Sequence, residues 1–301
     1  MPASQSTQAC HRIAVKAGQR IRPEPIRKAE MHNTSLITRR SVITGSGVGL
    51  LAMITGCTNT AGPDDPATAS PPQGGASGEW SYEGASGPQH WGELDDEFTT
   101  CSTGTAQSPI DVPSNAPLSS SPTTLDYTVA DFQARDTGHT VELHALSPQR
   151  ITVDGTQYTF KQMHYHAPSE HTVGGTSYEA EFHFVHQSDD DALAVIGVLA
   201  TAGKDNAAWS PVIDAVPATR GGNSPEVTGL TLTSLLPDSL GHYAYDGSLT
   251  TPPCSEGVRW LLLQTPIELS TGQIEDLRSV HSGNNRPTRP LNNRKISQTG
   301  Q

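Results

Sequence analysis

The sequence predicts a mainly β fold, in which one large and mostly antiparallel sheet is flanked by a few short helices. Composition is the first reason, because 28 Gly and 23 Pro among 301 residues suit short strands joined by many turns. Periodicity is the second reason, because several segments alternate apolar and polar residues as half-buried strands do. An apolar fraction of 34% is enough for a core.

The strand-like segments begin after residue 138 and continue to residue 269. In chain order they are HTVELHAL, RITVDGTQYTF, YEAEFHFVH, ALAVIGVLA, VTGLTLTSLLP and GVRWLLLQTPIEL. Asp154 and Gly155 lie between two runs and form a favoured two-residue hairpin turn. We expect short helices at NAAWSPVIDAV and TGQIEDLRSV, the latter with Thr271 as its N-cap. No linker or repeat interrupts the chain after Trp80, which predicts a single domain.

Charge is distributed unevenly along the chain, whose formal net charge is −12. Residues 1–56 contain eight Lys or Arg and two Glu, whereas the remainder contains eleven basic and twenty-nine acidic residues. An acidic body cannot neutralise backbone phosphates, so nucleic acid is excluded as a partner. The acidity mainly indicates solubility.

An export signal is the interpretation of the basic N-terminal part. Arg39 and Arg40 precede the apolar stretch 42–54, which is too short for a membrane-spanning helix of about 20 residues and fits a signal peptide. The segment TRRSVI resembles a twin-arginine signal, and ITGC resembles a lipobox with Cys57 as the lipidated residue. The alternative is an ordinary secretory signal in which Cys57 has no role.

Three segments are therefore expected before the domain. Residues 1–30 form an unused or disordered upstream segment, 31–56 a signal peptide of the twin-arginine or lipoprotein type, and 57–78 a flexible tether rich in Thr, Ala, Gly, Pro and Ser. The predicted location is periplasmic or at the cell surface, with a lipid anchor as the only membrane contact.

The four cysteines are Cys10, Cys57, Cys101 and Cys254, and none forms a CxxC pair that would predict a thiolate zinc site. Disulfides persist outside the cytoplasm, so Cys101 and Cys254 are natural partners in an exported domain. Such a bond would close a loop of about 150 residues and contribute at most about 5 kcal/mol.

Histidines are concentrated in QMHYHAPSEHTVGGTSYEAEFHFVH, residues 162–186, which contains five of the twelve in the chain. On a strand, His164 and His166 point to the same face. His183 shares that face if the two strands are neighbours, and the Gly-Gly pair between them suits a hairpin connection. Three converging imidazoles would form a zinc site with one open position.

Supporting residues lie in phase with these ligands. Gln162 precedes His164 by two residues and Glu181 precedes His183 by two, so each can hold the ring N–H that a metal leaves unused. A single histidine is more often a packed or surface residue, but this phased set favours metal binding.

A cupin barrel is the competing metal hypothesis, because HYHAPSE also satisfies HxHxxxE with Glu170 as a ligand. Cupins need a second motif in which a P-x-G turn precedes a further histidine. No P-x-G precedes His183, and Pro168 interrupts the strand before Glu170, which argues against a cupin.

With HYH, SEHTV, AEFHFVH and DGSLTTPPC, the chain resembles the α-class carbonic anhydrases from about Trp80 to Ile296. The segments WSYEGASGPQHW, AQSPIDV and NNRPTRPLNNR match as well. The resemblance implies a twisted ten-stranded sheet over residues 79–301 and one Zn²⁺ per chain, bound by His164, His166 and His183. It further implies that hydroxide formed at the zinc attacks carbon dioxide to give bicarbonate.

The resemblance also assigns roles to individual residues. Thr250 matches the residue that orients the hydroxide and donates its own proton to Glu170, and the carbonyl of Asn284 matches the group that fixes His166. His139 matches the proton shuttle. Cys101 and Cys254 match the disulfide of exported members. The pocket residues that match are Val185, Val195, Leu249, Thr251, Trp260 and Tyr82.

Departures from the family pattern occur at the pocket mouth. Asp136 and Thr137 replace two asparagines, and Glu142 stands where an amide is common, which predicts weaker inhibition by anions. Anions and sulfonamides are the expected inhibitors. The main alternative is a non-catalytic relative that acts as a binding or scaffolding module, and ester hydrolysis is a conceivable side activity.

Overall fold

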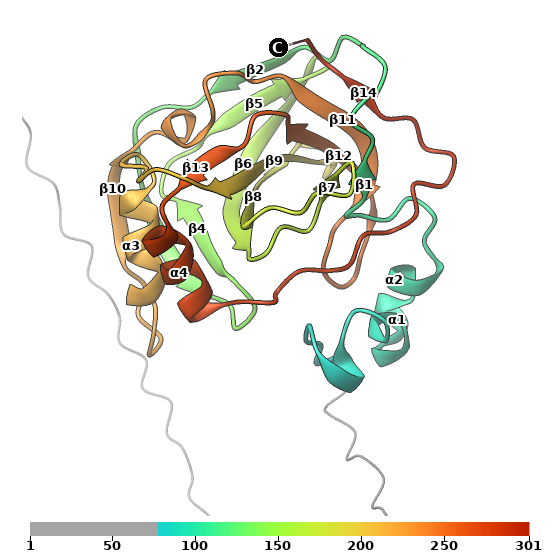
Figure 1. The fold of residues 1–301 in the computed structure, drawn as a ribbon, viewed down its shortest axis with the longest axis horizontal. Helices are drawn as coiled ribbons and strands as arrows, with labels where there is room; N and C mark the ends of the chain where they lie inside the picture. The colour runs from blue at the N-terminus through green and yellow to red at the C-terminus, as the bar shows by residue number, and fades with distance from the viewer. Residues whose placement is uncertain (1–77, 301) are drawn as a thin grey trace, which may run out of the picture. The chain divides into compact units, whose positions relative to one another are not determined.

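The computed structural model describes residues 78–300 (Figure 1). The predictions for residues 1–30 and 31–56, for most of the tether at 57–78 and for Cys57 lie outside this described part. Among the helices of residues 78–300, none combines the length and the apolar character that a membrane crossing requires.

One large, mostly antiparallel sheet forms the body of the domain, as predicted (Figure 1). Its hydrogen-bonded order is β10-β3-β4-β6-β8-β9-β12-β11-β14, with β13 paired to β9 and β2 and β5 extending from β6. The strands are β2 (Thr123–Asp126), β3 (Ala130–Asp136), β4 (Val141–Ala145), β5 (Arg150–Val153), β6 (Thr156–His166), β8 (Ala180–Gln187), β9 (Leu193–Ala202), β10 (Glu226–Leu230), β11 (His242–Ser248), β12 (Glu256–Leu263), β13 (Ile267–Leu269) and β14 (Ser297–Gln298). Two pairings within it, β9 with β12 and β9 with β13, are parallel.

The sheet has twelve strands in the described residues instead of the expected ten. Short pieces account for the difference, because β13 has three residues and β14 has two. A separate parallel pair joins β1 (Asp111–Val112) to β7 (Thr172–Val173).

Helices are short and peripheral, as the sequence predicts. Helix α3 packs against α4 and against β3 and β10, and Figure 1 shows the two helices side by side. The helical elements are η1 (Gly84–Ser86), α1 (Trp91–Leu94), η2 (Asp96–Phe98), α2 (Thr100–Thr103), α3 (Ser210–Ala218), η3 (Leu232–Leu235) and α4 (Thr271–Val280).

The central strands β8 and β9 are buried on both faces. On β8, Phe182 and Phe184 belong to the larger apolar core. On β9, Ile196 faces that same core, whereas its neighbour Val195 packs with Trp260 on the opposite face. Double burial explains why ALAVIGVLA is almost continuously apolar.

Local turn chemistry agrees with the prediction at the β5–β6 hairpin. Asp154 has φ 50° and Gly155 has φ 85°, so both occupy the left-handed region that a tight hairpin turn of this type requires. The flanking residues Val153 and Thr156 are paired across the turn.

Two local predictions are wrong. Helix α4 begins at Thr271, but its N-cap is Ser270, which is extended and forms a capping box with Gln273. The segment 232–235 forms the 3₁₀ turn η3 instead of a strand, because Leu232 and Leu235 are both fully buried and a 3₁₀ turn aligns residues three apart.

Cys101 and Cys254 form a disulfide, as predicted, across a sequence separation of 153 residues. The bond attaches α2 to the loop that connects β11 and β12, and both cysteines are buried beside Trp91. A covalent bond of this span therefore holds the N-terminal helices against the sheet.

Replacing both cysteines by serine should lower the free energy of unfolding by about 2–5 kcal/mol, because the unfolded chain regains the entropy of a long loop. Urea titration followed by tryptophan fluorescence measures the change. Wild-type protein under a strong reductant should lose a similar amount, whereas the double variant should be indifferent to the reductant. Equal stability of the oxidised wild type and the double variant would contradict the prediction.

Candidate metal centre

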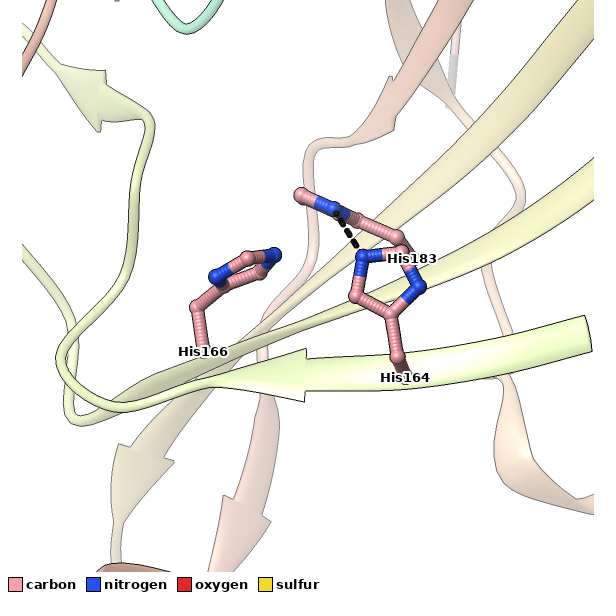
Figure 2. A group of neighbouring side chains, drawn as sticks. All are labelled: His164, His166 and His183. Carbon is pink, nitrogen blue, oxygen red and sulfur yellow. Dashed lines mark hydrogen bonds between the residues drawn. The ribbon is translucent and has the colours of Figure 1, made fainter. Parts of the chain in front are cut away.

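Strands β6 and β8 bring three histidines to one point. His164 and His183 are directly paired across the two strands, and His166 lies two residues along β6 on the same face. Figure 2 shows the three rings turned toward one another. One nitrogen from each ring lies within 4.8 Å of the others.

The outer nitrogen of each ring has an oxygen acceptor, which fixes its tautomer. The contacts are His164 Nδ1 to Gln162 Oε1 at 2.8 Å, His166 Nδ1 to the Asn284 carbonyl at 2.5 Å, and His183 Nε2 to Glu181 Oε1 at 2.8 Å. Because these oxygens only accept, the three nitrogens carry protons. Lone pairs therefore remain on His164 Nε2, His166 Nε2 and His183 Nδ1, and these face inward.

The inward nitrogens fit a tetrahedral zinc ion. His164 Nε2 and His183 Nδ1 are 3.3 Å apart (dashed line in Figure 2). Two nitrogens at the usual Zn–N distance of about 2.0–2.1 Å on a tetrahedral ion would lie about 3.3–3.4 Å apart. His166 Nε2 is buried without a hydrogen-bond partner among the described residues. Burial lowers the pKa of His166 to about 4, which keeps its ring neutral as a metal ligand must be.

Glu181 accepts hydrogen bonds from four groups next to the three histidines. Its fully buried carboxylate accepts from His183 Nε2, from His171 Nδ1 at 2.6 Å, and from the backbone N–H groups of Glu170 and His171. Burial alone would raise the pKa of Glu181, but the imidazoles of His171 and His183 together hold that pKa well below its usual value. The carboxylate is therefore ionised and can orient His183.

The other two histidines of the cluster lie where the sequence places them. His171 is buried, and its Nε2 lies 2.6 Å from the Tyr245 hydroxyl, so its two nitrogens are both satisfied. His186 points to the packed face, where its Nε2 contacts the Tyr127 hydroxyl at 2.7 Å. His171, Glu181 and His183 are also close enough to hold a metal, but their atoms are already joined by hydrogen bonds.

Glu170 is buried next to the metal centre. Its Oε1 accepts from the Arg286 backbone N–H at 2.8 Å, and its Oε2 lies 3.4 Å from His166 Nε2 without a hydrogen-bond partner among the described residues. Burial raises the pKa of Glu170 to about 7, against the opposing influences of His183, the Arg286 N–H and the Thr250 hydroxyl. Thr250 is also buried.

Arg286 is a supporting residue to which sequence reasoning assigned no role. Its buried guanidinium donates to the carbonyls of Cys101 and Ser108 and to Gln107 Oε1. These bonds anchor the segment whose backbone contacts Glu170. No local pattern could have identified this residue, because its partners lie 116 to 185 residues away.

A cavity of about 210 Å³ opens from the metal centre toward solvent. His164, His166, Gln162 and Thr251 line its inner part. The other lining residues are Trp80, Tyr82, Thr137, His139, Thr140 and Glu142. The structure thus brings the predicted shuttle, Tyr82 and Thr251 to the same cavity as the metal centre.

The predicted apolar wall is gathered in one cluster. Val195 and Trp260 are buried there, and Val185 and Leu249 pack against them half-buried. The Trp260 ring centroid is 4.8 Å from that of His183. Trp260 therefore packs against a candidate metal ligand, but none of the four residues is among those that line the cavity of about 210 Å³.

His139 lies half-buried at the mouth of the cavity. Its ring stacks on Trp80 with centroids 3.8 Å apart, a contact that sequence reasoning did not predict. Burial, and then the neighbouring His281, lower the pKa of His139 below its usual value, while Asp136 acts in the opposite direction. Asp136 itself is held by His281 at 2.7 Å.

Glu142 also lies at the mouth, where we expect added negative charge. Its Oε2 is 2.8 Å from His144 Nε2, so an imidazole N–H can donate to the added carboxylate. Its effect on anion inhibition stays a prediction.

Metal sites that have three protein imidazoles and an open fourth position are typical of mononuclear zinc enzymes. The chain belongs to the eukaryotic-type, or alpha, carbonic anhydrase family, because the model of that family matches residues 86–300. Members of this family catalyse carbon dioxide hydration, and the chain is accordingly an enzyme of the carbonic anhydrase type. The cupin hypothesis is overturned by this match.

Known relatives agree with this assignment. The chain is 38% identical to a carbonic anhydrase of Pectobacterium atrosepticum over 218 residues, covering 72% of this chain and 89% of the relative. An α-carbonic anhydrase of Thermovibrio ammonificans, solved in complex with the inhibitor sulfanilamide, is 39% identical with a TM-score of 0.70. A hyperthermostable carbonic anhydrase from a hydrothermal vent chimney is 41% identical with a TM-score of 0.69. The two structural alignments each cover 74% of this chain and 100% of the other.

Gln162→Ala should lower the affinity for Zn²⁺ by about 10-fold, because His164 loses the acceptor that fixes its tautomer and orientation. Competition with a chromophoric chelator measures the change. Gln187→Ala on β8 is the matched control, since that amide donates to Asp191 at the surface, away from the three histidines. Equal affinities of both variants and the wild type would show that Gln162 does not support the ligand.

Proposed function

We propose that the protein catalyses the reversible hydration of carbon dioxide to bicarbonate and a proton, with one Zn²⁺ per chain held by His164, His166 and His183. The observation that carries the proposal is the set of three inward lone pairs, each ring held from outside by an acceptor. Zinc bound there would act as a Lewis acid that lowers the pKa of a water to about 7 and so supplies a hydroxide nucleophile at neutral pH.

Thr250 and Glu170 are proposed to orient the attacking oxygen. The Thr250 hydroxyl would accept a hydrogen bond from that oxygen and donate its own proton to the Glu170 carboxylate, so that a lone pair points at the substrate. The Arg286 N–H supports this role, because it occupies Glu170 Oε1 and leaves Oε2 as the acceptor. A cation in the centre would favour the ionised form of Glu170.

Carbon dioxide is apolar, and the proposed binding surface is correspondingly apolar. Val185, Val195, Leu249 and Trp260 belong to one apolar cluster and would give the substrate a dry wall on one side of the centre. The Trp260 Nε1–H donates a hydrogen bond to the Ser248 carbonyl at 3.0 Å, so the indole presents no free donor to the substrate.

His139 is proposed to carry the proton from the centre to solvent. Tyr82 and Thr251 line the same cavity and would order a chain of water molecules between the metal centre and His139. Stacking on Trp80 holds the His139 ring at the mouth of the cavity, where the ring can release a proton to buffer.

Inhibitor binding and side activity follow from the same centre. The Thermovibrio ammonificans relative binds sulfanilamide, and we propose that sulfonamides and small anions bind the open metal position here. Ester hydrolysis by the same nucleophile is a proposed side activity.

Export and lipid anchoring remain proposals that rest on the sequence alone. The Arg39-Arg40 pair, the apolar stretch and Cys57 support an exported protein that is attached to a membrane through a lipid on Cys57. Mass spectrometry of the N-terminal peptide from the native host tests this. A diacylglyceryl-Cys57 terminus is expected, and an unmodified terminus elsewhere would exclude the lipoprotein.

Stopped-flow carbon dioxide hydration, together with zinc content, tests the proposed function. The purified chain should bind one zinc and hydrate carbon dioxide rapidly, and His164→Ala should reduce kcat/KM by at least about three orders of magnitude. Tightly bound zinc without hydration would instead support the binding or scaffolding module.

His139→Ala should lower kcat by about 10-fold or more in dilute buffer, and added imidazole should restore it. In the wild type, the rise of kcat with pH should have its midpoint below the pKa of about 6.5 of a free imidazole. The sign follows from the lowered pKa of His139, which makes its neutral, proton-accepting form available at lower pH. His144→Ala is the matched control and should keep most of the activity.

A further inference from the structure

A second cavity lies on the face of the sheet opposite the metal centre. It has a volume of about 290 Å³, and its floor is formed by Ile196, Leu261 and Leu263, which belong to the larger core. Their sequence neighbours Val195 and Trp260 point to the other face, where the metal centre lies. The sheet itself therefore separates the two cavities.

Among its described residues, the wall of this cavity combines apolar side chains with uncharged polar ones. Leu125, Leu236 and Leu240 complete the apolar lining, and Leu240 is 41% exposed at the rim. The polar side chains of the lining are Ser121, Thr123, His242 and Thr299. No Asp, Glu, Lys or Arg is among the described residues that line the cavity. The guanidinium of Arg259 donates to the lining residue Ser121 and is already paired with Asp154 at 3.1 Å. The described residues therefore offer no unpaired charge to an ionic ligand in this cavity.

One polar group of the wall lacks a partner. His242, which is 4% exposed, donates from Nδ1 to the Leu240 carbonyl at 3.0 Å. That bond places the proton on Nδ1 and leaves Nε2 as an acceptor. Nε2 is buried and has no hydrogen-bond partner among the described residues. Burial also lowers the pKa of His242, so the ring is neutral at physiological pH.

A buried acceptor without a donor destabilises the folded protein, and such groups are uncommon in folded proteins. A ligand hydroxyl that reaches Nε2 would satisfy it while the ring or chain of the ligand covers the leucines. The cavity volume is at the lower end of the range for small-molecule sites, which favours a compact ligand. The neutral wall favours an uncharged one.

We propose that this cavity is a second binding site, for a small uncharged molecule that has an apolar body and one hydroxyl donor, such as a simple phenol. The hydroxyl donates to His242 Nε2, and the apolar body packs on Ile196, Leu261 and Leu263. The site is independent of the zinc chemistry proposed above.

The test is a titration of the full, ¹⁵N-labelled chain with 4-methylphenol, followed by the backbone amide signals. Sulfanilamide is present at saturation to occupy the metal centre. Saturable shifts are expected at Gly241 and Thr299, which line the cavity, with a Kd on the order of 1 mM for so small a ligand. 4-Methylanisole has the same ring without the donor and should bind about fivefold more weakly.

Two variants locate the site. His242→Phe keeps a ring but removes the acceptor, and it should bind both compounds with the weaker affinity. Leu240→Trp fills the rim and should weaken binding of 4-methylphenol by at least about 10-fold. Leu146→Trp is the matched control, since Leu146 is 58% exposed and lies outside the cavity lining, and it should bind as the wild type does.

Three outcomes would overturn the proposal. The first is the absence of shifts at Gly241 and Thr299 up to the solubility limit of 4-methylphenol. The second is binding that appears only without sulfanilamide, with shifts confined to Gln162 and Thr251 at the metal centre. The third is equal affinity for both compounds that His242→Phe leaves unchanged. The Gly241 and Thr299 signals do not depend on zinc, so failure here is distinguishable from failure of the proposed enzyme chemistry.

Discussion

The buried carboxylate of Glu181 is the interaction on which the metal centre depends most. Removing such an ion from water is costly unless donors surround it, and here two imidazoles and two backbone N–H groups do so. The bonds reach His183 on β8 and the loop that carries Glu170, so one anion fixes a proposed ligand and the orienting carboxylate together. Gly197 on β9 is paired with His183 on β8. A Cβ at Gly197 would lie 2.8 Å from Leu262 and 3.4 Å from the Glu181 carboxylate, so the surroundings of this anion are closely packed.

Asn284 makes a similar connection at the other end of the site. Its backbone carbonyl holds His166, and its side chain bonds the Ala167 N–H and the carbonyls of His139 and Tyr165. One residue of the C-terminal segment therefore sets the position of a proposed metal ligand and of the backbone that carries the proposed shuttle. This geometry explains how a site drawn from distant segments can be rigid before any metal binds, which is what pre-organised catalysis requires.

The period of two along a strand made much of the site predictable. It placed His164, His166 and His183 on one face and put Gln162 and Glu181 behind them, since these relations are local. The Asp154-Gly155 turn was predictable for the same reason. Arg286 and Trp80 were not assigned their supporting roles, because Arg286 acts on partners more than 100 residues away and the stacking of Trp80 on His139 depends on how the N-terminal segment docks. Asn284 was found only through family resemblance. The 3₁₀ turn at 232–235 was missed because burial of two leucines overrides local strand propensity.

The most direct test of this account is X-ray absorption at the zinc K edge on the purified chain. Three imidazoles, oriented from outside by Gln162, Asn284 and Glu181, should hold one zinc and leave a single coordination position open. The spectrum should then fit three imidazole nitrogens and one oxygen at about 2.0–2.1 Å. A sulfur in the coordination shell, fewer than three imidazoles or a fourth protein ligand that closes the site would contradict it.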